Sequence, residues 1–227
     1  LIRNFPGFPL GEKMSSWLIF GRQILSFVSI FLIGFYLLWG FNYRRQPIEQ
    51  LLGMQPEPLG PDQLCEALVR ETQIIASLRS KMDTIMLPEG LEDTLREMLY
   101  SWSISNRLPV SGKVRTYKIY PKGIFLRFSS SGLYFPFSGQ GQVDAGLHPL
   151  DLPYVMTHEM AHGLGYGDEG TCNFLAYVST TSSNNPFIKY AGHLSYWRTL
   201  AASYNRYRPD DFRRIFQISA HSRFGND

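Results

Sequence analysis

The sequence predicts an α+β domain that is mostly helical, carries a small β-sheet and is preceded by one transmembrane helix. Three patterns predict this class. An uncharged run of 18 residues, Ile24–Phe41, lies near the N-terminus, segments at 114–120 and 133–137 are typical of strands, and helical periodicity returns after Pro149. The chain of 227 residues is long enough for one domain and an additional segment, because a domain has roughly 150 residues.

The composition excludes several classes of protein. Hydrophobic residues make up 44% of the chain, which excludes intrinsic disorder, and the net charge is only +3. Nucleic acid is not an expected partner, because the chain has no strong basic excess and no long basic run. Two cysteines, Cys65 and Cys172, are too few for a disulfide scaffold or a zinc-thiolate site. The chain begins at Leu1, as expected of a fragment or a processed form.

The N-terminal segment, residues 1–45, is predicted to hold the transmembrane helix at about 23–42. A bilayer core of ~30 Å needs about twenty apolar residues at 1.5 Å each. Arginines flank the apolar run on both sides, so the positive-inside rule does not orient it. Three aromatic residues at its C-terminal end are typical of a membrane interface: Tyr36, Trp39 and Tyr43.

Two other interpretations of this helix are a signal peptide and a helix buried in a soluble core. A signal peptide needs a shorter apolar region and a cleavage site of small residues, whereas FNYRRQP follows here. We therefore expect a single-pass anchor in this chain.

A linker and a folded domain are predicted to follow. Residues 46–62 contain four prolines and two glycines, which favours a linker or a surface loop, and residues 63–227 form the domain. Apolar periodicity predicts helices at 62–82, 91–108, 153–163, 169–181, 187–206 and 210–219. Strands or extended segments are predicted at 114–120, 124–128 and 133–137.

The motif that carries chemistry is HExxH, formed by His158, Glu159 and His162. The two histidines lie one helical turn apart and project from one face, so both can bind one Zn²⁺. Glu159 projects about 100° around the helix from His158, so it does not ligate the metal with the two histidines. It is expected to act as the general base on a metal-bound water. In a chain of this composition, chance produces the motif about 0.005 times.

A catalytic zinc site needs a third protein ligand, and two adjacent acids are candidates. Asp168 completes HExxHxxGxxD, a spacing similar to metzincin sites, but Asp is also a good helix N-cap. Glu169 and Asn173 share a helix face, which resembles the element of gluzincins that supplies a ligand and a brace for a histidine. We favour Glu169 as the ligand, Asp168 as the cap and Asn173 as the brace.

Four blocks of the chain resemble a bacterial family of membrane-anchored zinc peptidase-like proteins that is catalogued as a domain of unknown function. The blocks are WGFNYRR (39–45), GLYFPFSGQ (132–140), HEMAHGLGYGDEGTCNFLAY (158–177) and FIKYAGHLSYW (187–197). The resemblance covers about residues 8–205 and implies location in the bacterial cell membrane. Because the family is longer at both ends, it also implies further segments beyond this chain.

Three residues depart from the family pattern. Gln140 stands where the family usually has Glu, Thr171 falls in a replaced Glu-Ala pair, and His193 replaces a Tyr. Tyr190 matches a family tyrosine and shares a helix face with His193. We expect one of these two side chains to stabilise the oxyanion, unless this face only packs against the ligand helix.

The leading hypothesis is therefore a membrane-anchored zinc peptidase of gluzincin type that acts on a peptide or protein. The alternative is a catalytically inactive, zinc-stabilised membrane domain that binds a protein partner, which Gln140 and Thr171 would favour. Hydrolysis of a non-peptide amide is a third hypothesis.

Overall fold

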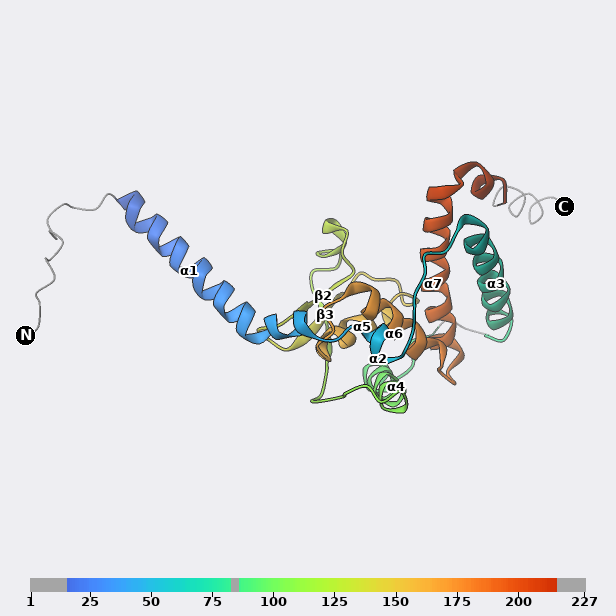
Figure 1. The fold of residues 1–227 in the computed structure, drawn as a ribbon, viewed down its shortest axis with the longest axis horizontal. Coiled ribbons are helices and arrows are strands. Elements are labelled where there is room, and N and C mark those ends of the chain that lie inside the picture. Colours follow the sequence, from blue (N-terminus) through green and yellow to red (C-terminus); the bar gives the residue numbers. More distant parts are fainter. Residues whose placement is uncertain (1–15, 83–85, 216–227) are drawn as a thin grey trace, which may run out of the picture.

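One long helix projects from the body of the molecule in the computed structural model, which describes residues 16–82 and 86–215 (Figure 1). This helix, α1 (Ser16–Leu38), has 23 residues and is long and apolar enough to cross a membrane. None of its residues is buried, which contradicts the interpretation as a core helix of a soluble domain. Of the predicted N-terminal segment, residues 1–15 lie outside the described residues.

The end of α1 differs from the predicted limit of about residue 42. The α-helix ends at Leu38, and the chain continues as the 3-10 helix η1 (Gly40–Arg44). Trp39 is 8% exposed and packs on Tyr134, with 5.0 Å between ring centroids. The Trp39 ring is therefore buried against the domain, and its expected position at a membrane interface stays a prediction.

Five further helices lie close to their predicted positions: α3 (Pro61–Arg79), α4 (Leu91–Ser105), α5 (Leu152–Gly163), α6 (Glu169–Thr181) and α7 (Pro186–Tyr207). The short helix α2 (Ile48–Leu51) was not predicted. Residues 209–215 are helical as well, and the rest of the helix predicted at 210–219 lies outside the described residues. Within the predicted linker, α2 buries Ile48 in the main core, so part of this segment belongs to the folded body.

The sheet has three strands in the order β1-β3-β2. β1 (Thr116–Ile119) runs parallel to β3 (Gln140–Asp144), and β2 (Gly132–Phe135) runs antiparallel to it. The central strand β3 was not predicted, because its sequence QGQVD has little apolar alternation. The strand expected at 124–128 is wrong, since Leu126–Phe128 forms the 3-10 helix η2.

The buried carboxylate of Asp144 explains the conformation around η2. It accepts hydrogen bonds from the backbone N–H groups of Gly123 at 2.7 Å and Phe125 at 2.8 Å, and from Gly146 at 2.6 Å. A side chain that captures several amides competes with the ladder of a sheet. The segment before β2 is thereby folded around Asp144 rather than paired as a strand.

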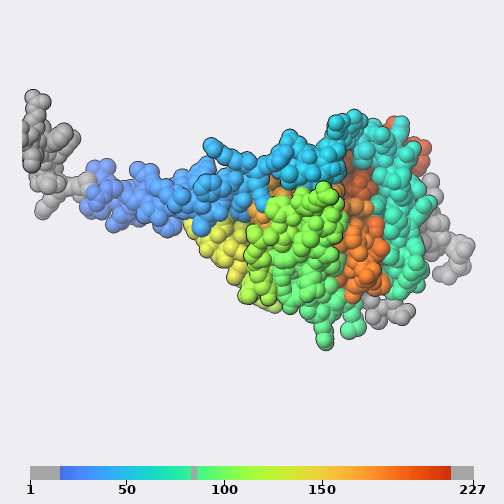
Figure 2. Space-filling model, turned by 60° about the horizontal axis from the view of Figure 1, so that its bottom comes forward, coloured from blue at the N-terminus to red at the C-terminus, as the bar shows by residue number. Residues whose placement is uncertain are grey.

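Helix α5 occupies the centre of the domain, between the sheet and the other helices. Its Met160 is fully buried with residues from four further elements: Leu95 and Leu99 of α4, Val143 of β3, Leu175 of α6 and Ile188 of α7. A second cluster joins Leu64 and Leu68 of α3 to Leu200 and Tyr204 of α7. Figure 2 shows these two helices, in teal and orange, at the end of the body far from α1.

Two glycines allow α5 to lie directly on the sheet. A Cβ at Gly141 would lie 2.6 Å from Cβ of Glu159 and 2.9 Å from Cγ2 of Thr116. A Cβ at Gly132 would lie 2.6 Å from Oε1 of Glu159. All three distances are below 3.0 Å, closer than Cβ atoms approach other heavy atoms in proteins, so this packing requires glycine.

We predict that Gly141→Ala lowers the free energy of unfolding by about 1–3 kcal/mol, the usual cost of overpacking a well-packed core. Thermal unfolding of the purified chain would measure it. Gly167→Ala is the control, because its Cβ would lie 3.8 Å from the Tyr43 ring, an ordinary contact. Equal melting temperatures for both variants would contradict the close approach.

Candidate metal centre

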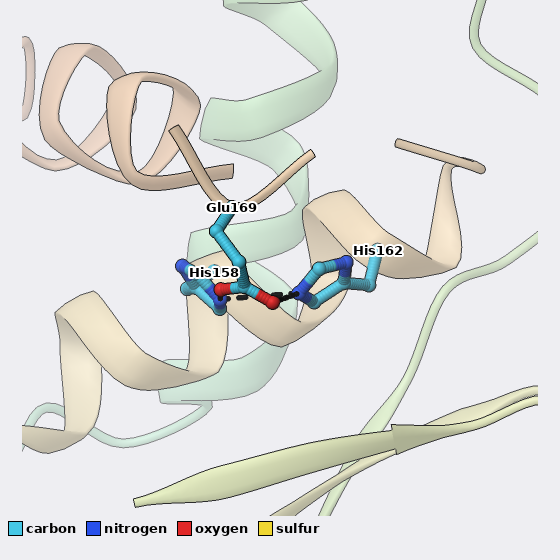
Figure 3. Close-up of side chains that lie close together, drawn as sticks. All are labelled: His158, His162 and Glu169. Atoms are coloured by element: carbon cyan, nitrogen blue, oxygen red, sulfur yellow. Dashed lines mark hydrogen bonds and ion pairs between the residues drawn. The ribbon is translucent and has the colours of Figure 1, made fainter. Parts of the chain in front are cut away.

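Helices α5 and α6 bring three potential metal ligands together: His158, His162 and Glu169 (Figure 3). Nε2 of His158 lies 3.1 Å from Oε2 of Glu169, and Nε2 of His162 lies 3.4 Å from Oε1. The two Nε2 atoms are 3.1 Å apart. All ligand atoms lie within 4.8 Å of one another, a spacing that one cation can bridge.

The loop after α5 orients His162. Its Nδ1 donates to the backbone oxygen of Tyr166 at 2.7 Å, which leaves the lone pair of Nε2 directed at Glu169. The thiol of Cys172, fully buried, donates to the same oxygen at 3.4 Å and lies 3.3 Å from Nδ1. Gly165, with φ of +89°, turns the loop back over the helix.

Asn173 braces the other histidine. Its side chain lies within reach of the His158 imidazole, and a hydrogen bond between them favours the protonated form of this histidine. Burial and the neighbouring His162 lower the pKa of His158, so this imidazole is neutral at pH 7. A neutral imidazole keeps the lone pair that a metal ion needs.

Asp168 caps α6 and does not join the cluster. Its Oδ1 accepts a hydrogen bond of 2.7 Å from the backbone N–H of Thr171, which is the N-cap arrangement. Glu169, the first residue of the helix, then extends toward the two histidines. The structure therefore brings Glu169, and not Asp168, to the two histidines.

Glu159 lies beside the cluster in a nearly dry environment. It is 5% exposed, and Gly132 and Gly141 of the sheet pack against its side chain. Among the described residues, no side chain or backbone group hydrogen-bonds its Oε2. Burial and the nearby Glu169 carboxylate raise the pKa of Glu159 to about 8. Such a carboxylate is suited to accept a proton.

A cavity of about 580 Å³ contains all four of these side chains. Its walls come from α1 and η1, from the segment around β2, and from α5 and α6. The lining residues include Phe35, Trp39, Tyr43, Ser129–Leu133, Tyr134, Pro136, Tyr154, Val155, Gly167 and Asn173. One wall is thus built by the helix that projects from the body.

The segment after α1 holds the loop that orients His162. The Trp39 ring stands edge-on to the imidazole of His162, with 6.2 Å between centroids. The guanidinium of Arg45 donates to the backbone oxygen of Leu164 and lies 4.8 Å above the Tyr166 ring. The WGFNYRR block is therefore part of the site, which the sequence did not indicate.

The structure does not bring the two expected oxyanion donors to the cavity. His193 is buried, and its Nδ1 lies 2.8 Å from Oε2 of Glu71 on α3. Tyr177 donates to the other oxygen of Glu71 at 3.1 Å. Tyr190 packs against the main core, and neither it nor His193 lines the cavity. Their position fits the packing interpretation of this helix face and not the oxyanion role.

Tyr154 is a cavity residue that the sequence analysis missed. It lies one helical turn before His158 on α5, so the spacing could have indicated it. Its hydroxyl lies 3.1 Å from the backbone oxygen and 3.3 Å from Oδ1 of Asn173. Burial raises the pKa of Tyr154 to about 12, which keeps the hydroxyl protonated and able to donate.

The departures from the family pattern lie outside the cavity as well. Gln140 begins β3, and Thr171 contributes its backbone N–H to the cap of α6. Neither residue lines the cavity, so neither departure removes a side chain from it.

The fold and the site therefore define a class of protein. It is a mostly helical α+β domain in which a His-His-Glu cluster lies beside a buried Glu. The chain belongs to the family described as "Protein of unknown function (DUF3810)", whose model matches residues 7–221. This confirms the predicted membership of a family of unknown function, while that description names neither an activity nor a metal. No curated protein and no solved structure matches the chain at a significant level.

We predict that the purified chain binds one Zn²⁺ and that Glu169→Gln weakens this binding, because a neutral amide is a poorer ligand than a carboxylate. Isothermal titration with Zn²⁺ would measure it. Asp168→Asn is the matched control: Asn caps helices as well as Asp, so zinc affinity should stay unchanged. Loss of zinc in the Asp168 variant alone would favour the metzincin-like alternative.

Proposed function

We propose that this protein is a membrane-anchored, zinc-dependent hydrolase of gluzincin type that cleaves peptide bonds. The observation that carries the proposal is the buried Glu159 carboxylate beside the cluster of His158, His162 and Glu169, in one cavity. A zinc site that only stabilises the fold does not require a base beside the metal, whereas metal-assisted hydrolysis requires one to accept a proton from water. Peptide is proposed as the substrate because HExxH on a helix is typical of peptidases.

The donor atoms fit Zn²⁺. Two imidazole nitrogens and one carboxylate form a ligand set found in catalytic zinc sites, which leave a further coordination position open. Cys172 is near His162 but occupies its Nδ1 side, so it does not compete as a ligand. When bound, Zn²⁺ would polarise the scissile carbonyl and lower the pKa of water.

The side chains of the chain supply the remaining steps. Glu159 accepts a proton from the attacking water and passes it to the leaving amine. The Tyr154 hydroxyl exchanges its hydrogen bond to Asn173 for one to the oxygen of the scissile carbonyl as negative charge develops there. Asn173 holds both groups in place, since it contacts the Tyr154 hydroxyl and the imidazole of His158.

Helix α1 is proposed to cross the bacterial cell membrane once. Its 23 residues would extend about 34 Å, enough for the hydrocarbon core of a bilayer. A signal peptide is removed from the mature protein, whereas this helix leads directly into residues that pack on the site, such as Trp39. The inactive alternative has less support, because Gln140 and Thr171 lie outside the cavity.

We predict that Glu159→Gln abolishes turnover and leaves zinc bound, because the amide cannot accept a proton and the ligands are unchanged. Hydrolysis of a mixed library of fluorescence-quenched peptides by the full chain, together with elemental analysis for zinc, would test it. Glu97→Gln, an exposed position on α4, is the control and should retain full activity. Activity that survives in the Glu159 variant would exclude this residue as the base.

We predict that Tyr154→Phe lowers kcat by about 10²–10³ with little change in KM, the usual effect of removing one oxyanion donor. The same library and a zinc assay would measure it. Tyr207→Phe, 63% exposed on α7, serves as the control. An unchanged kcat, or a loss that only follows lost zinc, would contradict the donor role.

A further inference from the structure

The hairpin between β2 and β3 packs along the last turns of α1. The Phe137 ring stacks on Phe31, with 4.9 Å between centroids and 26° between planes. Gly34 makes room for it, because a Cβ there would lie 2.9 Å from Cε1 of Phe137. Together with the contact between Tyr134 and Trp39, the hairpin follows the helix from its end back to Phe31. Figure 2 shows this yellow part of the chain next to the blue helix.

This contact reaches far into the apolar part of α1. A helix rises 1.5 Å per residue, so Phe31 lies about 10 Å before Leu38, the last residue of the helix. The nearest charged residues of the chain on either side of Phe31 are Arg22 and Arg44. If α1 crosses a bilayer core of ~30 Å, Phe31 and the ring stacked on it lie inside the hydrocarbon region.

The tip of the hairpin, residues 135–139, has the chemistry that this position requires. Its sequence FPFSG carries no charge. Pro136 lacks an N–H, and the N–H groups of Ser138 and Gly139 both donate to the backbone oxygen of Phe135, at 3.1 and 3.0 Å. Two of the backbone N–H groups of the tip are thereby satisfied within the turn, and the stacking of Phe137 on α1 covers one side of it, as non-helical backbone near lipid requires. Phe137 still exposes 40% of its surface, which is available to acyl chains.

The candidate metal centre lies at the level where α1 leaves the apolar region. Trp39, the residue that follows α1, contacts His162, and the cavity of the metal centre is also lined by Phe35 of α1 and by Leu133 and Pro136 of the hairpin segment. The wall of the cavity is therefore continuous with the surface that faces lipid. A substrate in this cavity lies beside the membrane boundary.

We propose that the hairpin tip enters the bilayer beside α1 and that the cavity takes a peptide segment lying at the membrane surface, next to the membrane anchor of the substrate protein. The inference rests on the proposed function, both for the crossing of α1 and for peptide hydrolysis. It adds the substrate class, which HExxH by itself does not define.

Three matched serine-to-cysteine variants test the position of the hairpin. Ser29→Cys lies on α1, Ser138→Cys at the hairpin tip and Ser105→Cys at the exposed end of α4. Each carries a nitroxide label in the full chain with Cys65→Ser, reconstituted in phosphatidylcholine vesicles, and the parent with Cys172 alone is the blank. Collisions with oxygen, which concentrates in lipid, are compared with collisions with a water-soluble nickel chelate.

The expected result is a preference for oxygen at Ser29 and Ser138 and for the nickel chelate at Ser105. Preference for the chelate at Ser138, with Ser29 still in lipid, would overturn the hairpin insertion and leave the anchor intact. Preference for the chelate at Ser29 would contradict the proposed anchor itself, and with it this inference.

Acylated peptide libraries test the substrate class. The same quenched library is presented in these vesicles either with a palmitoyl group attached through a two-residue spacer, or through a flexible spacer of about 20 residues, which reaches roughly 25 Å. A cavity at the membrane boundary cleaves the short-spacer library at least as fast as the long one. Cleavage of the long-spacer library alone would overturn the inference, whereas no cleavage of either would contradict the proposed peptidase activity.

Discussion

The close approach between α5 and the sheet is the constraint on which the rest of the site depends. Gly132 and Gly141 lack the side chains that would hold the sheet away, so the strands cover Glu159 and exclude water from it. The same contact positions one turn of α5 so that both histidines face the start of α6. A larger residue at either glycine would open the sheet from the helix and expose the carboxylate, which would then lose its elevated pKa.

The chain around the cluster is organised by backbone oxygens rather than by further charges. The backbone oxygen of Tyr166 accepts hydrogen bonds from the imidazole of His162 and the thiol of Cys172. The backbone oxygen of Leu164 accepts one from the guanidinium of Arg45. Because Arg45 lies just beyond α1, the orientation of a candidate ligand is linked to the position of the projecting helix.

The buried group of His193, Glu71 and Tyr177 has a different role from the candidate metal centre. It joins α3, α6 and α7 through two hydrogen bonds to one carboxylate. A buried carboxylate is tolerated when its oxygens are paired, and here both are. His193 therefore belongs to the helical packing and does not line the cavity.

Local patterns in the sequence determined most of the helices and the core of the candidate site. The spacing of His158 and His162 and the cap at Asp168 act within about one helical turn, so sequence alone could predict them, whereas Asn173 reaches His158 only because α6 packs on α5. Tertiary structure decided the features that depend on distant segments. The parallel pairing of β1 with β3, the capture of the Gly123, Phe125 and Leu126 amides by Asp144 and the placement of His193 against Glu71 join residues 18 to 122 positions apart. Such contacts leave no periodic signal in the sequence. The spacing of apolar residues shows which face of a helix or strand is buried, but not which other segment packs against that face.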